Sequence, residues 1–385
     1  MFRPQIQKTW VVLLVAIFSV LMVYFAMGSI TYHETVGFQE KIKSVEIMEE
    51  ALSFLKKEVK RRYPDEAILR VIDPNLTGLI FNRPKSPMTT YSGDLKSKQT
   101  VLKPNFAALL VDLFIKAKLS KGDTIAVGMT GSMPGANIAL FSACKAMEIV
   151  PAVMTSVGAS EWGATDSNFT WLDMEATLQA NNVISLKTIA ASLGGRADKY
   201  KELPIKGIIY GGKRGHELAR KAILRNGIKE AKGVAHRKLL YENFIHQGAL
   251  SNYSAYINIG GGVISMGVGG NKILKKKTGI IYPDEIIEQG LDKSMVREFA
   301  DVGVNLINIY NIPRLIMDDF GNELIGFGGK KSKTGEGLLF YSESYTLWTS
   351  MLALLLTLGV VIAISIKSYH QINEHMYSYE TDSIL

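Results

Sequence analysis

Hydrophobic residues are concentrated in two uninterrupted runs, one near each end of the chain. No charged residue occurs in 10–30 or in 345–366. A helix of about 20 residues, rising about 1.5 Å per residue, crosses a hydrocarbon core of about 30 Å. Both runs are therefore predicted to be transmembrane helices rather than buried helices of a soluble core.

The residues that flank these runs predict their orientation. Arg3 and Lys8 precede the first run, so a cleavable signal peptide is an alternative for it. The run is longer than an h-region of about 7–15 residues, which favours an uncleaved anchor. Arg3 and Lys8 hold the N-terminus in the cytoplasm, and Lys367 does the same for the C-terminus. The lysines just inside the long central segment favour the opposite orientation, but long segments cross membranes largely regardless of charge.

Between the two runs, the pattern of apolar residues first predicts one long amphipathic helix and then short strands that alternate with helices. Apolar positions recur every three or four residues in an amphipathic helix that Pro64 ends: Ile42, Val45, Met48, Leu52, Leu55 and Val59. This helix is expected to lie against the domain or along the membrane, with dimerisation as the alternative. Residues 73–98 are rich in turn formers and predict a long irregular loop, which in a compact domain is often functional.

After this loop, short apolar strands alternate with helices. Strands are expected at 124–127, 150–155, 207–210, 255–259 and 306–309, with helices between them. Such alternation predicts an α/β fold with a mostly parallel sheet and helices on both faces, Rossmann-like, flanked by the two transmembrane helices. A division into two lobes near 198–204 is left open.

The predicted organisation follows from these patterns. It comprises a cytoplasmic tail (1–9), a transmembrane helix (10–30), a juxtamembrane amphipathic helix (31–64), an extracytoplasmic α/β domain (65–344), a second transmembrane helix (345–366) and a cytoplasmic tail (367–385). The protein is thus expected to cross a membrane twice, with both termini in the cytoplasm and its main domain outside.

Charge and cysteine content narrow the classes of partner. The net charge is +8, and the residues outside the central segment contribute nothing to it. A basic domain facing outward favours anionic partners, whereas nucleic acid is not expected because no binding motif for it is present. Cys144 is the only cysteine, which excludes an intramolecular disulfide and a cysteine-based zinc site. The six histidines lack metal-binding spacing, so no metal and no cofactor are predicted.

Several predicted strands end in loops of small residues, which meet at the carboxyl edge of a parallel sheet, where such folds bind ligands. The best candidate for an anion-binding loop is 128–135, in which Gly128, Thr130, Gly131 and Ser132 precede a helix whose first amides suit an anion. It is not a phosphate-binding Walker loop, a dinucleotide fingerprint or a nucleophile elbow. The alternative is that its glycines only serve a tight turn.

Residues 156–175 form the second candidate site. Ser156, Ser160 and Trp162 are candidate ligand-binding residues, as are the basic pair Lys213 and Arg214, which suit carboxylates. The candidate catalytic residues of both loops are Ser132, Ser160, Asp173 and Glu175. The alternatives are that Trp171 lies in the core, that Asp173 caps a helix and that the basic pair is a solvated surface. A triad of Ser132 or Ser160 with His216 and Asp173 is a further arrangement that only geometry can test.

These motifs give the chain a resemblance to a known family. They are Asp73-Pro-Asn-Leu-Thr-Gly78, Lys103-Pro-Asn-Phe-Ala107, Gly122-Asp-Thr-Ile-Ala-Val-Gly128, Ser156-Val-Gly-Ala-Ser-Glu-Trp-Gly163, Phe169-Thr-Trp-Leu-Asp-Met-Glu175 and Asn258-Ile-Gly-Gly-Gly262. In these motifs and in both anchors the chain resembles the poly-γ-glutamate system protein family, membrane-anchored proteins associated with the machinery that makes and exports poly-γ-glutamate in bacteria. The resemblance implies a pathway, and a place in the inner, cytoplasmic membrane of a bacterium, but no catalytic residue.

Three functions follow from the resemblance and the basic domain. The leading one is a membrane-anchored accessory that binds poly-γ-glutamate or another anionic polymer and assists its assembly, export or anchoring. The second is an amidase or transpeptidase-like hydrolase that acts on γ-glutamyl bonds through a Ser or Thr of the glycine-rich loops. The third is a structural scaffold for the membrane subunits of the synthase. The expected partners are accordingly the polymer, the lipid bilayer and those synthase subunits.

Overall fold

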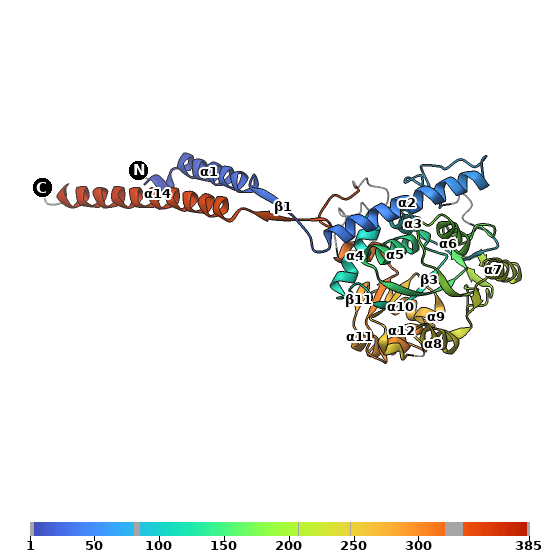
Figure 1. Cartoon of the computed structure of the whole chain (residues 1–385). Coiled ribbons are helices and arrows are strands. Elements are labelled where there is room, and N and C mark those ends of the chain that lie inside the picture. Colours follow the sequence, from blue (N-terminus) through green and yellow to red (C-terminus); the bar gives the residue numbers. More distant parts are fainter. Residues whose placement is uncertain (1–3, 81–84, 207, 247, 320–333, 383–385) are drawn as a thin grey trace. The chain divides into compact units, whose positions relative to one another are not determined.

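The computed structural model describes residues 4–80, 85–206, 208–246, 248–319 and 334–382 (Figure 1). The chain forms two compact units, each described here by itself. The first comprises Met1–Glu34 and Tyr341–Leu385, and the second is Thr35–Phe340.

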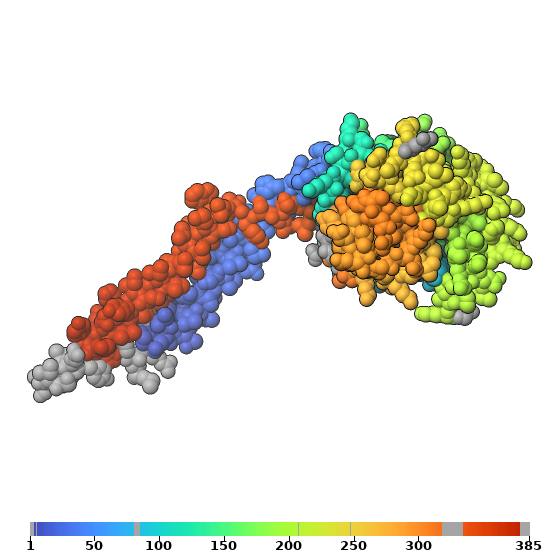
Figure 2. All heavy atoms as spheres, turned by 90° about the horizontal axis from the view of Figure 1, so that it is seen from below, coloured from blue at the N-terminus to red at the C-terminus, as the bar shows by residue number. Residues whose placement is uncertain are grey.

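The first unit contains two apolar helices, α1 (Thr9–Met27) and α14 (Leu347–Asp382), preceded by the short helix η1 (Gln5–Gln7). Both are long and apolar enough to cross a membrane. They lie side by side, blue and red in Figure 2, and most of their apolar side chains are exposed. A helix that is apolar on all sides and exposed suits lipid better than water. Helix α14 also continues well beyond the apolar run that ends at residue 366.

A two-stranded antiparallel ribbon accompanies these helices in the first unit. It pairs β1 (Ile30–Glu34) with β13 (Tyr341–Tyr345). Thr349 Oγ1 donates to Ser29 Oγ at 2.6 Å next to this ribbon. Residues 31–34 were expected to be helical, but their β-branched and aromatic side chains favour the strand that they form.

The amphipathic helix α2 (Phe38–Arg62) belongs to the second unit. Its apolar face packs against α4 (Asn105–Lys116) and α5 (Pro134–Met147), where Met48 and Leu55 are fully buried. The helix therefore lies against the domain, which was one of the two expected positions.

The core of the second unit is a seven-stranded sheet in the order β11-β12-β10-β3-β4-β6-β9. Every pairing is parallel except that of β11 with β12. The strands are β3 (Thr124–Thr130), β4 (Val150–Ser156), β6 (Thr188–Ser192), β9 (Lys229–Glu230), β10 (Ala255–Ile259), β11 (Gly279–Ile281) and β12 (Leu306–Ile309). The expected α/β fold with a mostly parallel sheet is confirmed.

Helices cover both faces of this sheet (Figure 1). Helices α2, α4 and α5, with α6 (Trp171–Ala180), lie over one face, and α8 (Gly233–Phe244), α9 (Val263–Met266) and α12 (Met295–Ala300) over the other. On the second face, Tyr256 of β10 stacks on Phe299 with ring centroids 4.6 Å apart. Tyr241 and Tyr253 meet Phe299 edge-on, which completes a buried aromatic cluster.

Smaller elements border the carboxyl ends of the strands. A parallel pair joins β2 (Thr89–Tyr91) to β5 (Ala159–Ser160), and an antiparallel hairpin joins β7 (Leu203–Ile205) to β8 (Ile208–Tyr210). The other helices are α3 (Leu95–Val101), α7 (Lys213–Arg225), α10 (Gly270–Leu274), α11 (Pro283–Ile287), α13 (Ile312–Asp319) and η2 (Leu250–Asn252). The strand expected at 207–210 thus pairs within a hairpin, and residue 207 itself lies outside the described residues. The long loop expected at 73–98 contains β2 and the start of α3.

The order of the strands defines a switch point between β3 and β10. From β3 the chain adds β4, β6 and β9 on one side and then returns to place β10 and β12 on the other. Connections from β3 and β10 therefore leave in opposite directions. In open α/β sheets the crevice outside the carboxyl ends of two such strands is the usual place for a ligand.

Candidate functional site

The switch point brings the first glycine-rich loop against the last one. A Cβ added to Gly260, whose φ is +85°, would lie 2.6 Å from Thr130 Oγ1, and one on Gly262 would lie 3.8 Å from Ser156 Oγ. Gly128 is needed for close packing inside the sheet, because its Cβ would lie 2.4 Å from the Tyr256 hydroxyl. The predicted residues Thr130 and Ser156 therefore converge with the backbone of 260–262 at the carboxyl edge.

A buried polar cluster continues from Ser156 along this edge. Ser156 Oγ lies 3.2 Å from Ser192 Oγ, which donates to Asp198 Oδ1 at 2.8 Å. Arg237 of α8 donates from Nη2 to Ser192 Oγ at 2.5 Å, and this nitrogen lies 3.7 Å from Asp198 Oδ2. Burial raises the pKa of Asp198, and the charge of Arg237 opposes that rise. Arg237 was not singled out from the sequence, where it is one of many basic residues.

A second cluster joins the candidate serines of both loops to a lysine. Lys98 Nζ lies 2.8 Å from Ser160 Oγ and donates to the backbone oxygen of Ser132. The Ser160 amide in turn donates to Ser132 Oγ at 3.0 Å. Lys98 is only 2% exposed, and burial lowers the pKa of its amine to about 7. Ser132 and Ser160 are partly exposed as residues, whereas Lys98 is buried.

The backbone around Ser160 is held tightly in place. A Cβ on Gly163 would lie 2.7 Å from the Ser132 backbone oxygen, and one on Gly93 would lie 2.1 Å from that of Glu161. Trp162, between these contacts, has a φ of +66°, which is rare for a residue other than glycine. Such strain is commonest at functional sites and persists only where the surroundings enforce it. Trp162 is partly exposed beside Ser160, so it is available to a ligand.

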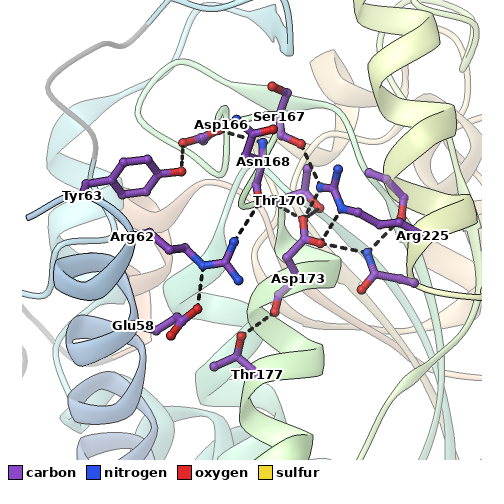
Figure 3. Close-up of polar contacts among 12 residues, drawn as sticks. Glu58, Arg62, Tyr63, Asp166, Ser167, Asn168, Thr170, Asp173, Thr177 and Arg225 are labelled. Carbon is purple, nitrogen blue, oxygen red and sulfur yellow. Dashed lines mark hydrogen bonds and ion pairs between the residues drawn. The ribbon is translucent and has the colours of Figure 1, made fainter.

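Asp173 lies in a separate network on α6 (Figure 3). Its Oδ2 accepts from the amide and hydroxyl of Thr170, forming a capping box at the start of the helix. Arg225 donates to both carboxylate oxygens, and Asn226 donates to Oδ1 at 3.0 Å. Burial raises the pKa of Asp173, but the bonds from Arg225, Thr170 and Asn226 outweigh it and leave the pKa lowered. The carboxylate is therefore engaged in fixing the helix start.

A chain of contacts extends from α2 to this network. Arg62 donates from Nη1 to the Asn168 backbone oxygen at 3.2 Å, and the Tyr63 hydroxyl donates to Asp166 (Figure 3). Arg225 reaches the Ser167 backbone oxygen at 2.8 Å. Residues 166–173 are thus clamped between α2 and α7. Trp171 is fully buried, as the alternative interpretation expected.

Glu175 is separated from the serines by the length of a strand. Its carboxylate accepts from the Thr188 amide at 2.5 Å and the Thr188 hydroxyl at 2.8 Å, at the beginning of β6. Burial raises the pKa of Glu175 to about 7. It lines a cavity of about 440 Å³ together with Lys187, Asn226 and Lys229. The structure thus places this candidate at the amino end of β6 and not at the carboxyl edge.

The basic pair and the histidine occupy the start of α7. Lys213 and Arg214 are exposed, and His216 is partly exposed. Within the residues that the structure describes, no hydrogen bond joins His216 to either serine or to Asp173, and no group of three metal-ligating side chains occurs. A triad of these residues is therefore not assembled.

Comparisons of the chain with known proteins found no match. No protein-family model matches the chain, and neither a curated protein nor a solved structure does. The fold and the site define the class, which is an α/β domain with a polar carboxyl edge, carried on a chain with two helices able to cross a membrane.

Proposed function

We propose that the chain is a membrane-anchored accessory of poly-γ-glutamate biosynthesis. Its Thr35–Phe340 unit binds the anionic polymer outside the cell and assists its assembly, export or anchoring. The polymer is suggested by the family resemblance of the sequence motifs, and the basic unit supplies the physical support.

The observation that carries this proposal is where the positive charge lies. Residues 35–340 hold 41 basic and 31 acidic side chains, a net charge of +10, and within them 196–238 hold 13 basic and 4 acidic, a net +9. We call 196–238 the basic segment. Eleven of its basic residues are exposed: Arg196, Lys199, Lys201, Lys206, Lys213, Arg214, Arg220, Lys221, Arg225, Lys229 and Lys232.

Few of these exposed charges are neutralised within the protein. Among the described residues, ion pairs hold only Arg220, with Glu230 at 3.7 Å, and Arg225, with Asp173. The segment occupies part of the molecular surface in the yellow-green colours of Figure 2. A polymer with about one carboxylate per residue would be attracted to such a surface, and salt would weaken the attraction.

The membrane part of the proposal rests on the two apolar helices. Thr35 donates its amide to the Phe340 backbone oxygen at 2.9 Å, so the two ends of the second unit lie next to each other. Two anchors joined to adjacent ends would tether the domain at one place. We propose that the anchors cross the bacterial inner membrane with both termini in the cytoplasm, and that they contact the membrane subunits of the synthase.

Polymer binding is tested with the full-length protein in detergent micelles and fluorescently labelled poly-γ-glutamate. Fluorescence anisotropy should show binding at low salt that weakens as salt is added. Changing four exposed lysines of the basic segment to Glu should weaken binding by about tenfold or more: Lys199, Lys201, Lys206 and Lys213. The matched control changes four exposed lysines elsewhere to Glu: Lys43, Lys57, Lys276 and Lys293.

An equal loss of polymer affinity in the two quadruple variants would show that only net charge matters, and no binding at low salt would refute the proposal.

The orientation in the membrane is tested separately, by adding protease to intact spheroplasts. Digestion of the Thr35–Phe340 unit is expected, and full protection would reverse the topology. If the two anchors alone restored polymer production in a deletion strain, the scaffold function would replace polymer binding.

A further inference from the structure

Lys98 is buried without an acidic partner. Within the described residues no carboxylate forms an ion pair with it, and the nearest acidic group along its helix, Asp94, is engaged by the amide and hydroxyl of Ser97. The neighbours of Lys98 Nζ are the Ser160 hydroxyl and the Ser132 backbone oxygen, both of which are neutral. A buried ammonium without an ion-pair partner is costly, so burial favours the neutral amine, although the charge of Asp94 acts in the opposite direction.

We propose that Ser160 is a nucleophile and that Lys98 is its general base, in a site that cleaves or transfers acyl groups. A serine is a weak nucleophile until a base within hydrogen-bond reach takes its proton. A neutral lysine serves as this base in Ser–Lys enzymes, and the 2.8 Å separation lies within the required reach. The neutral amine accepts from Ser160 through its lone pair and still donates to the Ser132 backbone oxygen.

The protonation of Lys98 fits this role. Burial lowers the pKa of its amine to about 7, so about half of the molecules carry a neutral amine near neutral pH. The tightly held segment 161–163 then fixes the direction of the Ser160 hydroxyl. Ser132 acts as a positioning residue, because its Oγ accepts from the Ser160 amide at 3.0 Å.

The reaction balances with water as the only co-reactant. Ser160 Oγ bonds to the carbonyl carbon of an amide while its proton moves to Lys98 Nζ. The C–N bond breaks, the leaving nitrogen takes that proton, and an ester remains on Ser160. Water then attacks the ester and gives a proton to Lys98, which returns it to Ser160 Oγ as the acid leaves. An amine in place of water gives transfer instead of hydrolysis.

The surroundings of Ser160 favour an acyl chain that carries carboxylates. Strand β2 pairs with β5, which contains Ser160, and contacts the β7–β8 hairpin of the basic segment. The Tyr210 hydroxyl at the end of β8 donates to Glu161, the residue after Ser160, at 2.9 Å. A polyanion on the hairpin would thus lie near the nucleophile. The substrate class, an amide bond within an anionic γ-glutamyl chain, rests on the proposed function, whereas the nucleophile and base do not.

The nucleophile is tested by labelling the full-length protein in detergent with a fluorophosphonate probe and locating the adduct by mass spectrometry. Labelling of wild-type protein is expected at Ser160 and should be lost in Ser160→Ala. Lys98→Met should slow labelling by about 100-fold or more. Lys96→Met, which changes an exposed lysine on the same helix, should leave the rate within about twofold.

The pH profile separates a base from a structural lysine. Because the neutral amine is the active form, the labelling rate of wild-type protein should rise with pH and level off above about 7. Circular dichroism and thermal melting check that each variant is folded. Labelling that persists in Ser160→Ala, or a flat pH profile in folded wild-type protein, would overturn the assignment.

The substrate class has a separate readout. Poly-γ-glutamate incubated with wild-type protein should shorten, and with Ser160→Ala it should remain intact. Labelling at Ser160 without shortening of the polymer would reject the γ-glutamyl substrate and keep the nucleophile. Polymer binding without labelling would reject the nucleophile and keep the proposed function.

Discussion

Among the buried lysines of the Thr35–Phe340 unit, Lys41 and Lys98 are the two least exposed, and only one of them forms an ion pair. Lys41 of α2 is 1% exposed, and its Nζ donates to Asp112 Oδ1 at 2.7 Å, to Thr35 Oγ1 at 3.0 Å and to the Leu339 backbone oxygen at 3.0 Å. Lys98 of α3 is 2% exposed and has only neutral partners. The two regions therefore differ in whether a carboxylate forms an ion pair with the buried lysine.

The difference separates a structural lysine from a reactive one. The ion pair with Asp112 at 2.7 Å, together with the bonds to Thr35 and Leu339, ties both ends of the unit to α4. Without such a partner, an amine is driven toward its neutral form and gains a lone pair that can take a proton. Burial alone therefore does not point to a functional lysine, whereas burial beside a hydroxyl and without an ion pair makes a lysine a candidate.

The largest expected effect comes from breaking the Lys41 region. Lys41→Met leaves the partly buried Asp112 without its buried partner, although Lys116 at 3.1 Å still reaches it. The free energy of unfolding should fall by about 3 kcal/mol, the low end of the range for a broken buried pair. Urea unfolding in mild detergent measures this change. Lys43→Met, at an exposed position on the same helix, should stay within about 0.5 kcal/mol of wild type.

A pH-dependent effect should appear in the Lys98 region. The pKa of Lys98 is about 10.5 in the unfolded chain and about 7 in the folded one, so between these values the unfolded chain binds more protons. Stability of wild-type protein relative to Lys98→Met should therefore rise with pH across this window, by up to about 1.4 kcal/mol per pH unit. Unfolding curves at pH 7, 8 and 9 measure the slope. Parallel curves for the two proteins would contradict the unpaired state of Lys98.

The smallest effect is expected where an ion pair is partly exposed. Arg225→Gln removes the bidentate partner of Asp173, but the Arg225 side chain is 37% exposed and Thr170 and Asn226 remain. Solvent screening limits the loss in unfolding free energy to about 0.5–1 kcal/mol. Thermal melting at low and high salt provides the measurement, and the loss should shrink as salt is added. If Arg225→Gln lowered the free energy of unfolding as much as Lys41→Met, the contribution of an ion pair to stability would not depend on its solvent exposure.

Much of the fold was predictable because it depends on local patterns. Charge-free runs of about 20 residues predicted α1 and α14, and alternation of short strands with helices predicted the parallel sheet. Strand β6 was missed, since its two alanines, its threonine and its serine are only weakly hydrophobic, and β8 was chosen in its place. Whether a short apolar segment joins a sheet or a hairpin depends on its partners, which the local pattern does not contain.

The candidate site was predictable only in part. Loops after parallel strands must reach one edge, so Thr130, Ser132, Ser156 and Ser160 were found from glycine and serine patterns. Lys98 was missed because it is 62 residues from Ser160 in a turn-rich stretch, where a lysine ordinarily faces water. Asp173 and Glu175 share the segment of Ser160, but α6 carries them away from the edge.

The amino-acid sequence by itself determined the two apolar helices, the α/β class and the basic segment, because hydrophobic period and charge are properties of the chain. The tertiary structure decided which polar groups meet. It buried Lys98 against Ser160 and placed Asp112 beside Lys41, and these contacts decide which of the two lysines has an ion-pair partner. Protonation depends on burial and on the nearest charges, and both are fixed by packing between segments that are distant in the chain.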